Sequence, residues 1–217
     1  MKPFLIWVLS IFIFFSQCTT DKPLNNEAVR KEISSREIKR ITEAEIVGKV
    51  HEIGSTIALA TKKTLGKNLQ NAMMNGGVEN AISYCNLNAM PLVDSLSRTF
   101  EAKIRRVSMK PRNSDDYPDD LENSILEAYD YQWKDSIELK TNVQSIDGGS
   151  YLFTKPIFID NGLCLNCHGS KSNGLSQQTH DFIKSKYPLD KAIGYSIGDL
   201  RGMWSITIPK KRVIQSF

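Results

Sequence analysis

The chain has 217 residues and a formal net charge of +4, with 41% hydrophobic and 24% charged residues. This composition is ordinary for a protein with one buried core, so a single domain is the default expectation. The basic excess is small, and the basic runs lack interleaved aromatic residues on which bases would stack. We therefore expect no nucleic-acid partner.

The N-terminus has the features of a secretory signal. Met1 and Lys2 supply a short positive region, and residues 4–15 form an apolar run interrupted only by Ser10. At about a dozen residues, this run is shorter than the roughly 20 that a membrane-spanning helix needs. We expect residues 1–17 to be a signal peptide and the protein to be exported to the periplasmic side.

A second targeting feature follows at residues 15–18, whose sequence Phe-Ser-Gln-Cys resembles the lipobox of bacterial lipoproteins. The match is imperfect, because Phe15 stands where Leu is usual and Gln17 where Gly or Ala is usual. Lipidation of Cys18 would anchor the protein to a membrane, whereas simple cleavage and retention of the signal remain open alternatives. The polar residues 18–40 would then be a flexible tether.

The next two segments are predicted to be helical. Residues 41–74 carry apolar side chains at intervals of three and four, which is typical of an amphipathic helix. Asn75-Gly76-Gly77 should end it, and a second helix should follow as far as Leu96, with Cys85 on its apolar stripe. Pro91 is expected to kink or break this second helix.

The rest of the chain changes from helical to strand-like patterns. We expect a strand at 101–109, a turn-rich segment at 110–118, a helix opened by Asp119 and Asp120, and further strands at 136–146, 151–159 and 194–208. Asp147-Gly148-Gly149 would form a hairpin turn. This order predicts an α+β domain with an antiparallel sheet over residues 41–217.

The most specific motif is Cys164-Leu165-Asn166-Cys167-His168. C-x-x-C-H places two thiols close enough to add to the two vinyl groups at one porphyrin edge, and an imidazole that reaches the iron from the same side. Chance would produce the motif in a chain of this composition about once in a thousand times. The motif predicts one covalently bound haem c, with His168 as an axial iron ligand.

Two other uses of the cysteine pair are weaker. A thioredoxin-like dithiol should follow an early strand in a βαβ unit, whereas Cys164 comes late in the chain. A zinc site would need a second pair of ligands at finger-like spacing, and none is present.

Cys85 is a lone thiol in a chain that we expect to be exported. It would be either a small buried hydrophobic residue or a second axial ligand, with its thiolate stabilised by ferric iron. Position on a helix does not by itself choose between these two roles.

Beyond the haem motif, several segments resemble the haem-binding, PAS-like domain of bacterial c-type haem proteins, a family long catalogued as a domain of unknown function. The resemblance covers roughly residues 41–209, and the segments that carry it are 81–86, 89–91, 106–113, 151–156, 164–169, 187–195 and 198–202. The family pattern tends to have Pro after Arg-Asn, where this chain has Ser114.

The resemblance implies a PAS-like antiparallel sheet preceded by long helices, and a haem held by His on one face and Cys on the other. Cys85 matches the position of that second ligand. Arg106, Lys110 and Arg112 would contact the haem propionates, or else form a solvated face.

Other residues compete for the second axial position. The candidates are the two remaining histidines, His51 and His180, and the methionines, including Met73, Met74, Met90 and Met109. Both histidines are better interpreted as solvated, and Met109, placed in a strand, as a core residue. A vacant sixth coordination position also remains open.

Two functions follow from a haem with His and thiolate ligands. The first is a membrane-tethered, low-potential electron-transfer protein, because an anionic ligand favours ferric iron. The second is a sensor in which reduction, NO or CO displaces the weaker ligand and alters a surface read by a separate chain. The chain ends at Phe217 without an output domain, which favours the carrier. Enzymatic activity has little support, because a cysteine in the sixth position would block an open distal site.

Overall fold

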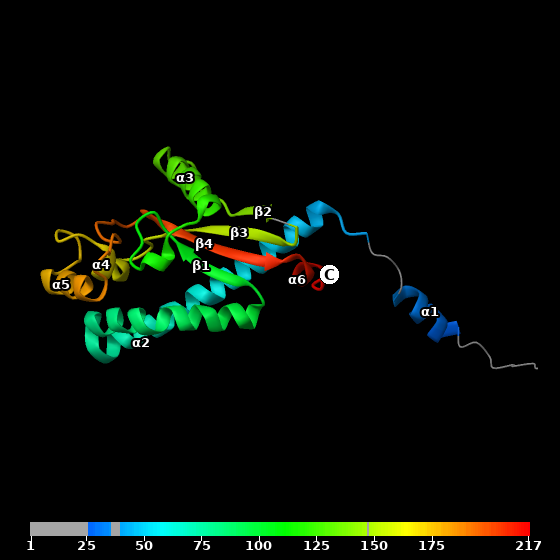
Figure 1. Ribbon diagram of the computed structural model, residues 1–217, viewed down its shortest axis with the longest axis horizontal. Coiled ribbons are helices and arrows are strands. Elements are labelled where there is room, and N and C mark those ends of the chain that lie inside the picture. The colour runs from blue at the N-terminus through cyan, green and yellow to red at the C-terminus, as the bar shows by residue number, and fades with distance from the viewer. Residues whose placement is uncertain (1–25, 36–39, 147) are drawn as a thin grey trace, which may run out of the picture. The chain divides into compact units, whose positions relative to one another are not determined.

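The computed structural model describes residues 26–35, 40–146 and 148–217 (Figure 1). The expected signal peptide, Cys18 and Asp147 lie outside these ranges. Helix α1, Asn26–Ser35, falls within the segment expected to be a tether, and its side chains at 26–34 are exposed. The chain divides into two compact units at Arg40, and the unit Ile41–Phe217 carries everything described below. Among the described helices, none is long and apolar enough to cross a membrane.

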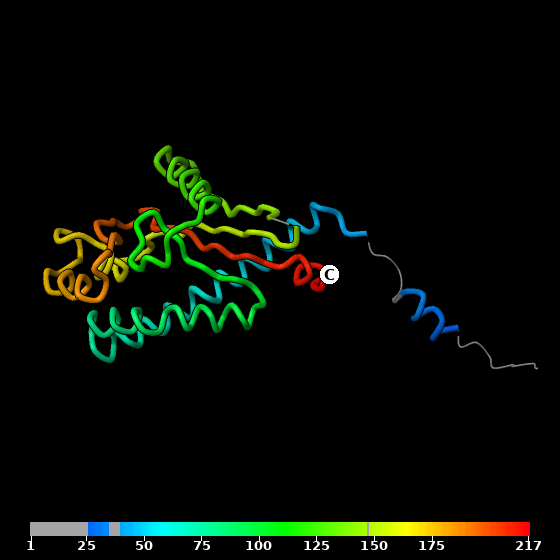
Figure 2. Tube along the Cα trace, viewed as in Figure 1, coloured from blue at the N-terminus to red at the C-terminus, as the bar shows by residue number. Residues whose placement is uncertain are grey.

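Helix α2, Glu43–Phe100, is a hairpin of two helical arms, which run in opposite directions in Figure 2. It begins with a capping box, in which the Thr42 side chain accepts a hydrogen bond from the backbone of Glu45. The arms meet at Gly76 and Gly77, whose backbone torsions are not helical, and Gly77 has a φ of 72°. The Asn80 side chain donates a 2.7 Å hydrogen bond to the Ala72 carbonyl at the end of the first arm. The predicted break between the two helices is therefore confirmed.

Pro91 was expected to kink or break the second arm; it lies inside this arm, and the helix is not broken there. The only non-helical residues within α2 are Gly76 and Gly77. A proline deprives the carbonyl four residues earlier of its donor, which here is the carbonyl of Leu87. Leu87 is exposed, so water can replace the missing hydrogen bond.

The sheet has four antiparallel strands in the order β1-β4-β3-β2. The strands are β1 Lys103–Val107, β2 Asn142–Ile146, β3 Ser150–Phe158 and β4 Leu200–Pro209. The predicted α+β class with an antiparallel sheet is thus confirmed. The last expected strand starts later than predicted, because Gly194 and Gly198 adopt positive φ values of 83° and 92° and form loops instead.

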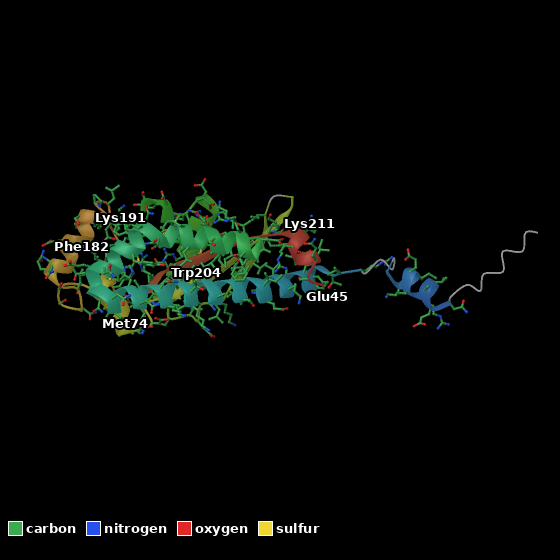
Figure 3. The ribbon with its side chains drawn as sticks, turned by 90° about the horizontal axis from the view of Figure 1, so that it is seen from below. Glu45, Met74, Phe182, Lys191, Trp204 and Lys211 are labelled. Atoms are coloured by element: carbon green, nitrogen blue, oxygen red, sulfur yellow. The ribbon has the colours of Figure 1, made fainter. Side chains whose placement is uncertain are left out.

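Each face of the sheet is covered by helices. Alternate residues such as Phe153 and Trp204 face α2, where they pack with Ile57 and other buried residues of both arms. Figure 3 shows Trp204 behind the α2 hairpin. The opposite face packs against α3, Asp120–Lys134, through Leu152, Met203 and helix residues such as Leu126.

Helix α6, Lys210–Ile214, directly follows β4. The other three elements lie at the end of the sheet near the hairpin turn of α2 (Figure 1). They are the short helix η1, Ser114–Asp116, and the helices α4, Gly162–His168, and α5, Gln177–Lys186. Helix α5 was not predicted, because its residues are mostly polar. In the structure Ser176 caps this helix, because its side chain accepts a 3.0 Å hydrogen bond from the backbone of Thr179.

Candidate functional site

A cavity of about 300 Å³ lies where α2, the end of β3 and helix α4 meet. This volume is at the lower end of the range typical of sites for small molecules and cofactors. Both arms of α2, β1, the end of β3 with the residue after it, and α4 supply its apolar walls. These include Leu69, Ala81, Ile82, Ala89, Val107, Ile157, Ile159 and Leu163. The site therefore combines segments that lie far apart in the sequence.

Helix α4 carries the C-x-x-C-H motif into this cavity. Asn161 caps the helix by accepting a 3.0 Å hydrogen bond from the backbone of Leu163. Cys164, Cys167 and His168 all line the cavity, and both cysteines are free thiols. One helical turn thus places two thiols and one imidazole on the same wall.

The imidazole of His168 is oriented by the loop that follows α5. Its Nδ1 atom lies 2.7 Å from the carbonyl oxygen of Ala192. Because a carbonyl only accepts hydrogen bonds, Nδ1 carries the proton and the lone pair of Nε2 is free. Burial, reinforced by the positive charges of Arg112 and Arg201, holds the pKa of His168 well below its usual value. The side chain is therefore a neutral imidazole, the form that binds a metal.

Cys85 lines the same cavity from the second arm of α2. Burial raises the pKa of its thiol, and the positive charges of Arg106 and Arg112 oppose this effect. Burial also raises the pKa of Cys167, to about 11. The structure therefore brings Cys85 together with the C-x-x-C-H motif, as expected of a second ligand.

Arg112 has a different environment from the one expected. Its Nε atom lies 3.2 Å from a carboxylate oxygen of the buried Asp190, and only 12% of its side chain is exposed. Its Nη2 atom donates hydrogen bonds to the carbonyls of Cys167 and Ala192. Arg112 thus holds the end of α4 against the loop that orients His168, although it also lines the cavity.

The other two basic residues predicted to contact propionates differ from each other. Arg106 lines the cavity, and among the described residues its side chain has no hydrogen-bond or ion-pair partner. Lys110 does not line it, and its Nζ atom lies 5.7 Å from the centre of the Tyr195 ring. Arg106 is therefore the better placed of the two for an anion in the cavity.

The residues that compete with Cys85 as second axial ligand differ in whether they line the cavity. Met73 and Met90 line the cavity, whereas the other four candidates do not. His51 is partly buried rather than solvated, with Nδ1 at 3.1 Å from the Thr141 hydroxyl oxygen. His180 lies on α5 beside Asp181, and Met74 is exposed. Met109 follows β1 and is exposed, so its predicted place in the core is wrong.

Several cavity residues with polar side chains were not predicted as site residues, among them Asp116, Tyr187 and Arg201. Burial raises the pKa of Asp116, against the lowering effect of Arg106, Arg201 and Arg105. The Nε atom of Arg201 is buried without a hydrogen-bond partner. Arg201 belongs to a segment that carries the family resemblance, and nothing else in the sequence indicated that it lines the cavity.

One ion pair connects two walls of the cavity. Lys62 of α2 and Asp160, just before α4, lie 2.5 Å apart, and both line the cavity. Asp160 and Asn161 also lie 3.8 Å and 3.6 Å from the Cys164 sulfur. The lysine lowers the pKa of Asp160, so this carboxyl is ionised beside the first thiol of the motif.

These residues fit a haem better than a bare metal ion. Within 26–35, 40–146 and 148–217, no group of three or more His, Cys, Asp or Glu side chains could hold a metal ion. A haem needs only axial ligands from the protein, together with apolar walls and partners for its carboxylates. The cavity is lined by His168, whose Nε2 atom is free, by Cys85, and by Arg201, whose guanidinium is not fully paired.

Comparisons with known proteins agree with this chemistry. The search of curated protein sequences gave no match. Among solved structures, the chain is similar to one described as the crystal structure of the cyanobacterial heme-protein Tll0287, with 25% sequence identity and a TM-score of 0.52. The match covers 74% of this chain and 96% of that one. The model of the Tll0287-like family matches residues 19–209, so the chain belongs to the Tll0287-like family of haem-binding domains of unknown function.

Proposed function

We propose that the protein is an exported c-type cytochrome that carries a single haem. Cys164 and Cys167 would form the thioether bonds, and His168 would be one axial ligand. The observation that carries the proposal is the shared cavity, which Cys164, Cys167, His168 and Cys85 all line. Relationship to a haem protein supports the cofactor independently. The proposal also includes a PAS-like sheet, a lipid anchor at Cys18 and location on the periplasmic side.

Bound haem would supply reversible one-electron chemistry at the iron. The chain's own residues decide how that iron is held. Ala192 fixes the tautomer of His168, and the arginines near Cys85 favour the thiolate that ligation requires. An anionic sulfur ligand stabilises ferric iron, so the midpoint potential would be low.

Electron transfer is the function that this arrangement supports best. Phe158 and Leu163 line the cavity and are also exposed to solvent, at 37% and 57%. The cavity therefore reaches the surface beside the attachment helix, where a redox partner could approach the haem edge. A cysteine in the sixth position leaves no open site for a substrate, so we propose a carrier rather than an enzyme.

A haem-based sensor is the second candidate, and the placement of the two ligands favours it. His168 belongs to α4 and Cys85 to α2, so the bond to Cys85 can break while the thioether bonds keep the haem in place. Reduction, NO or CO would then release the second arm of α2 from the iron. In this proposal a separate partner chain reads that change.

Purified protein tests both candidates. An intact mass increased by one haem, with a pyridine haemochrome spectrum typical of two thioether bonds, would support the c-type assignment, and a mass without haem would contradict it. Stopped-flow mixing of ferrous protein with CO or NO then separates the functions. A carrier should remain six-coordinate and bind gas slowly or not at all, whereas a sensor should bind it rapidly.

A further inference from the structure

The guanidinium group of Arg201 is only partly satisfied by protein partners. Its Nη1 atom donates hydrogen bonds of 2.7 Å to the Ser108 hydroxyl and 3.1 Å to the Lys110 carbonyl. Its Nε atom is buried and has no partner, although Arg201 lines the cavity. No carboxylate of the described residues forms an ion pair with it. A buried donor without a partner is costly, so the cavity is incomplete on this side.

The charges around the cavity indicate what is missing. Arg106, Arg112 and Arg201 contribute three positive charges to its lining, and Arg112 is paired with Asp190. The two other arginines face one cavity-lining acid, Asp116, whose pKa is raised by burial. This wall therefore favours an anion, and carboxylates match guanidinium groups best.

We propose that Arg201 binds a haem propionate through its incompletely paired guanidinium group, with Arg106 as the second cation on the same side of the cavity. The inference rests on the proposed function, because the haem is the source of the carboxylate. It replaces Lys110 and Arg112 as the main propionate partners, since the former does not line the cavity and the latter is held by Asp190, Cys167 and Ala192.

Arg201 also connects this side of the cavity to the axial histidine. Its Cζ atom lies 5.4 Å from the centre of the buried Tyr195 ring. The same ring meets the His168 imidazole edge-on, with centroids 6.3 Å apart, and the backbone N–H of Tyr195 donates to the His168 carbonyl at 2.9 Å. Arg201 is thus a positioning residue for His168 as well as a binding residue for the propionate.

The test compares holoprotein variants at Arg201 with a matched control at Lys110. Lys110 also places its cation near the Tyr195 ring but does not line the cavity. Resonance Raman spectroscopy of the propionate bending mode reports hydrogen bonds to the carboxylates, and redox titration reports the midpoint potential. Arg201→Gln should shift the bending mode and lower the midpoint, because a lost cation stabilises ferric iron. Lys110→Gln should leave the bending mode unchanged.

Arg201→Lys keeps the charge but loses the planar guanidinium donors. It should therefore restore most of the midpoint potential but not the wild-type bending mode. It also serves as the test variant if Arg201→Gln does not fold. An unchanged bending mode in haem-loaded Arg201 variants would overturn the proposal. Equal midpoint shifts in Arg201→Gln and Lys110→Gln, without a Raman change, would show that Arg201 acts only through the Tyr195 ring. That result would also overturn the propionate contact. A wild-type protein without attached haem would instead overturn the proposed function.

Discussion

The Nδ1 atom of His168 lies 2.7 Å from the carbonyl oxygen of Ala192, and this contact fixes which imidazole nitrogen faces the cavity. Ala192 is itself held from two sides. Its backbone N–H donates a 2.9 Å hydrogen bond to Asp190, and its carbonyl also accepts a 3.1 Å bond from Arg112. The orientation of the proposed iron ligand therefore depends on a buried ion pair that does not touch the imidazole.

Removal of Asp190 should destabilise the protein and disturb the histidine. Asp190→Ala leaves the guanidinium of Arg112 buried without its carboxylate, which we expect to cost about 3–5 kcal/mol in the free energy of unfolding. Urea denaturation measures this loss, and a broadened low-spin EPR signal of the ferric haem would report the disordered ligand. Asp130→Ala is the control, because it removes an exposed i,i+4 pair with Lys134 worth only about 0.3–0.5 kcal/mol. Equal losses in the two variants would contradict this role of Asp190.

The identity of the second axial ligand has a direct spectroscopic test. Cys85→Ser should remove the thiolate features of the ferric spectrum and raise the midpoint potential, because a neutral ligand no longer stabilises ferric iron. Met73→Leu and Met90→Leu are the matched controls, since both methionines line the same cavity. Their spectra should be those of the wild type. A wild-type spectrum in Cys85→Ser, or its loss in either methionine variant, would assign the ligand elsewhere.

Alanine substitutions at two glycines of the first arm of α2 should change the stability of the protein in opposite directions. A Cβ atom at Gly54 would lie 2.2 Å from Cγ of the fully buried Phe153 ring, so Gly54→Ala should lower stability by about 1–3 kcal/mol. A Cβ atom at the exposed Gly48 meets nothing within 4 Å, and Gly48→Ala should add about 0.5–1 kcal/mol through helix propensity. Thermal unfolding monitored by circular dichroism compares both. A neutral Gly54→Ala would mean that the arm and the sheet are less tightly packed.

Because of Tyr129, the free energy of unfolding should depend on pH in the alkaline range. Its hydroxyl lies 2.9 Å from that of the fully buried Thr154, and burial raises its pKa above the ordinary value of 10. A group whose pKa is raised on folding contributes stability below its unfolded pKa and loses it as pH rises through the folded value. Tyr129→Phe should cost about 1 kcal/mol at neutral pH, and this difference should shrink above about pH 10.

Denaturant titrations at neutral and alkaline pH measure that difference. Tyr131→Phe is the control. Because Tyr131 is 66% exposed, this substitution should leave the free energy of unfolding unchanged at every pH. A Tyr129→Phe deficit that stays constant to high pH would rule out ionisation of the buried phenol as the cause.

The fold was predictable where local patterns determine it. The glycine pair at 76 and 77 showed where α2 turns, and short runs rich in aromatic and β-branched residues located β3 and the core part of β4. Helix α5 was missed because only Thr179 and Ile183 of its ten residues are buried, which leaves little apolar periodicity. The start of β4 was misplaced because positive φ angles at Gly194 and Gly198 are a property of the loop and not of hydropathy.

The candidate site was predictable only in part. The C-x-x-C-H spacing is local, so the sequence alone predicted that Cys164, Cys167 and His168 share one wall of the site. Cys85 required an apolar stripe and a family resemblance, because 83 residues separate it from His168 (168 − 85). The role of Arg112 in holding Cys167 and Ala192, and the unpartnered donor of Arg201, depend on tertiary contacts that no spacing in the sequence reveals.

The wide sequence separation of the cavity walls also has a consequence for folding kinetics. The α2 hairpin forms from neighbouring residues, whereas docking it against α4 and β4 brings together segments such as Lys62 and Asp160, which are 98 residues apart. Contacts of this kind close large loops and slow the folding of a domain. We therefore expect an early helical hairpin and a later, rate-limiting closure of the cavity, so that the thiols of α4 stay accessible to the attachment of haem until that last step.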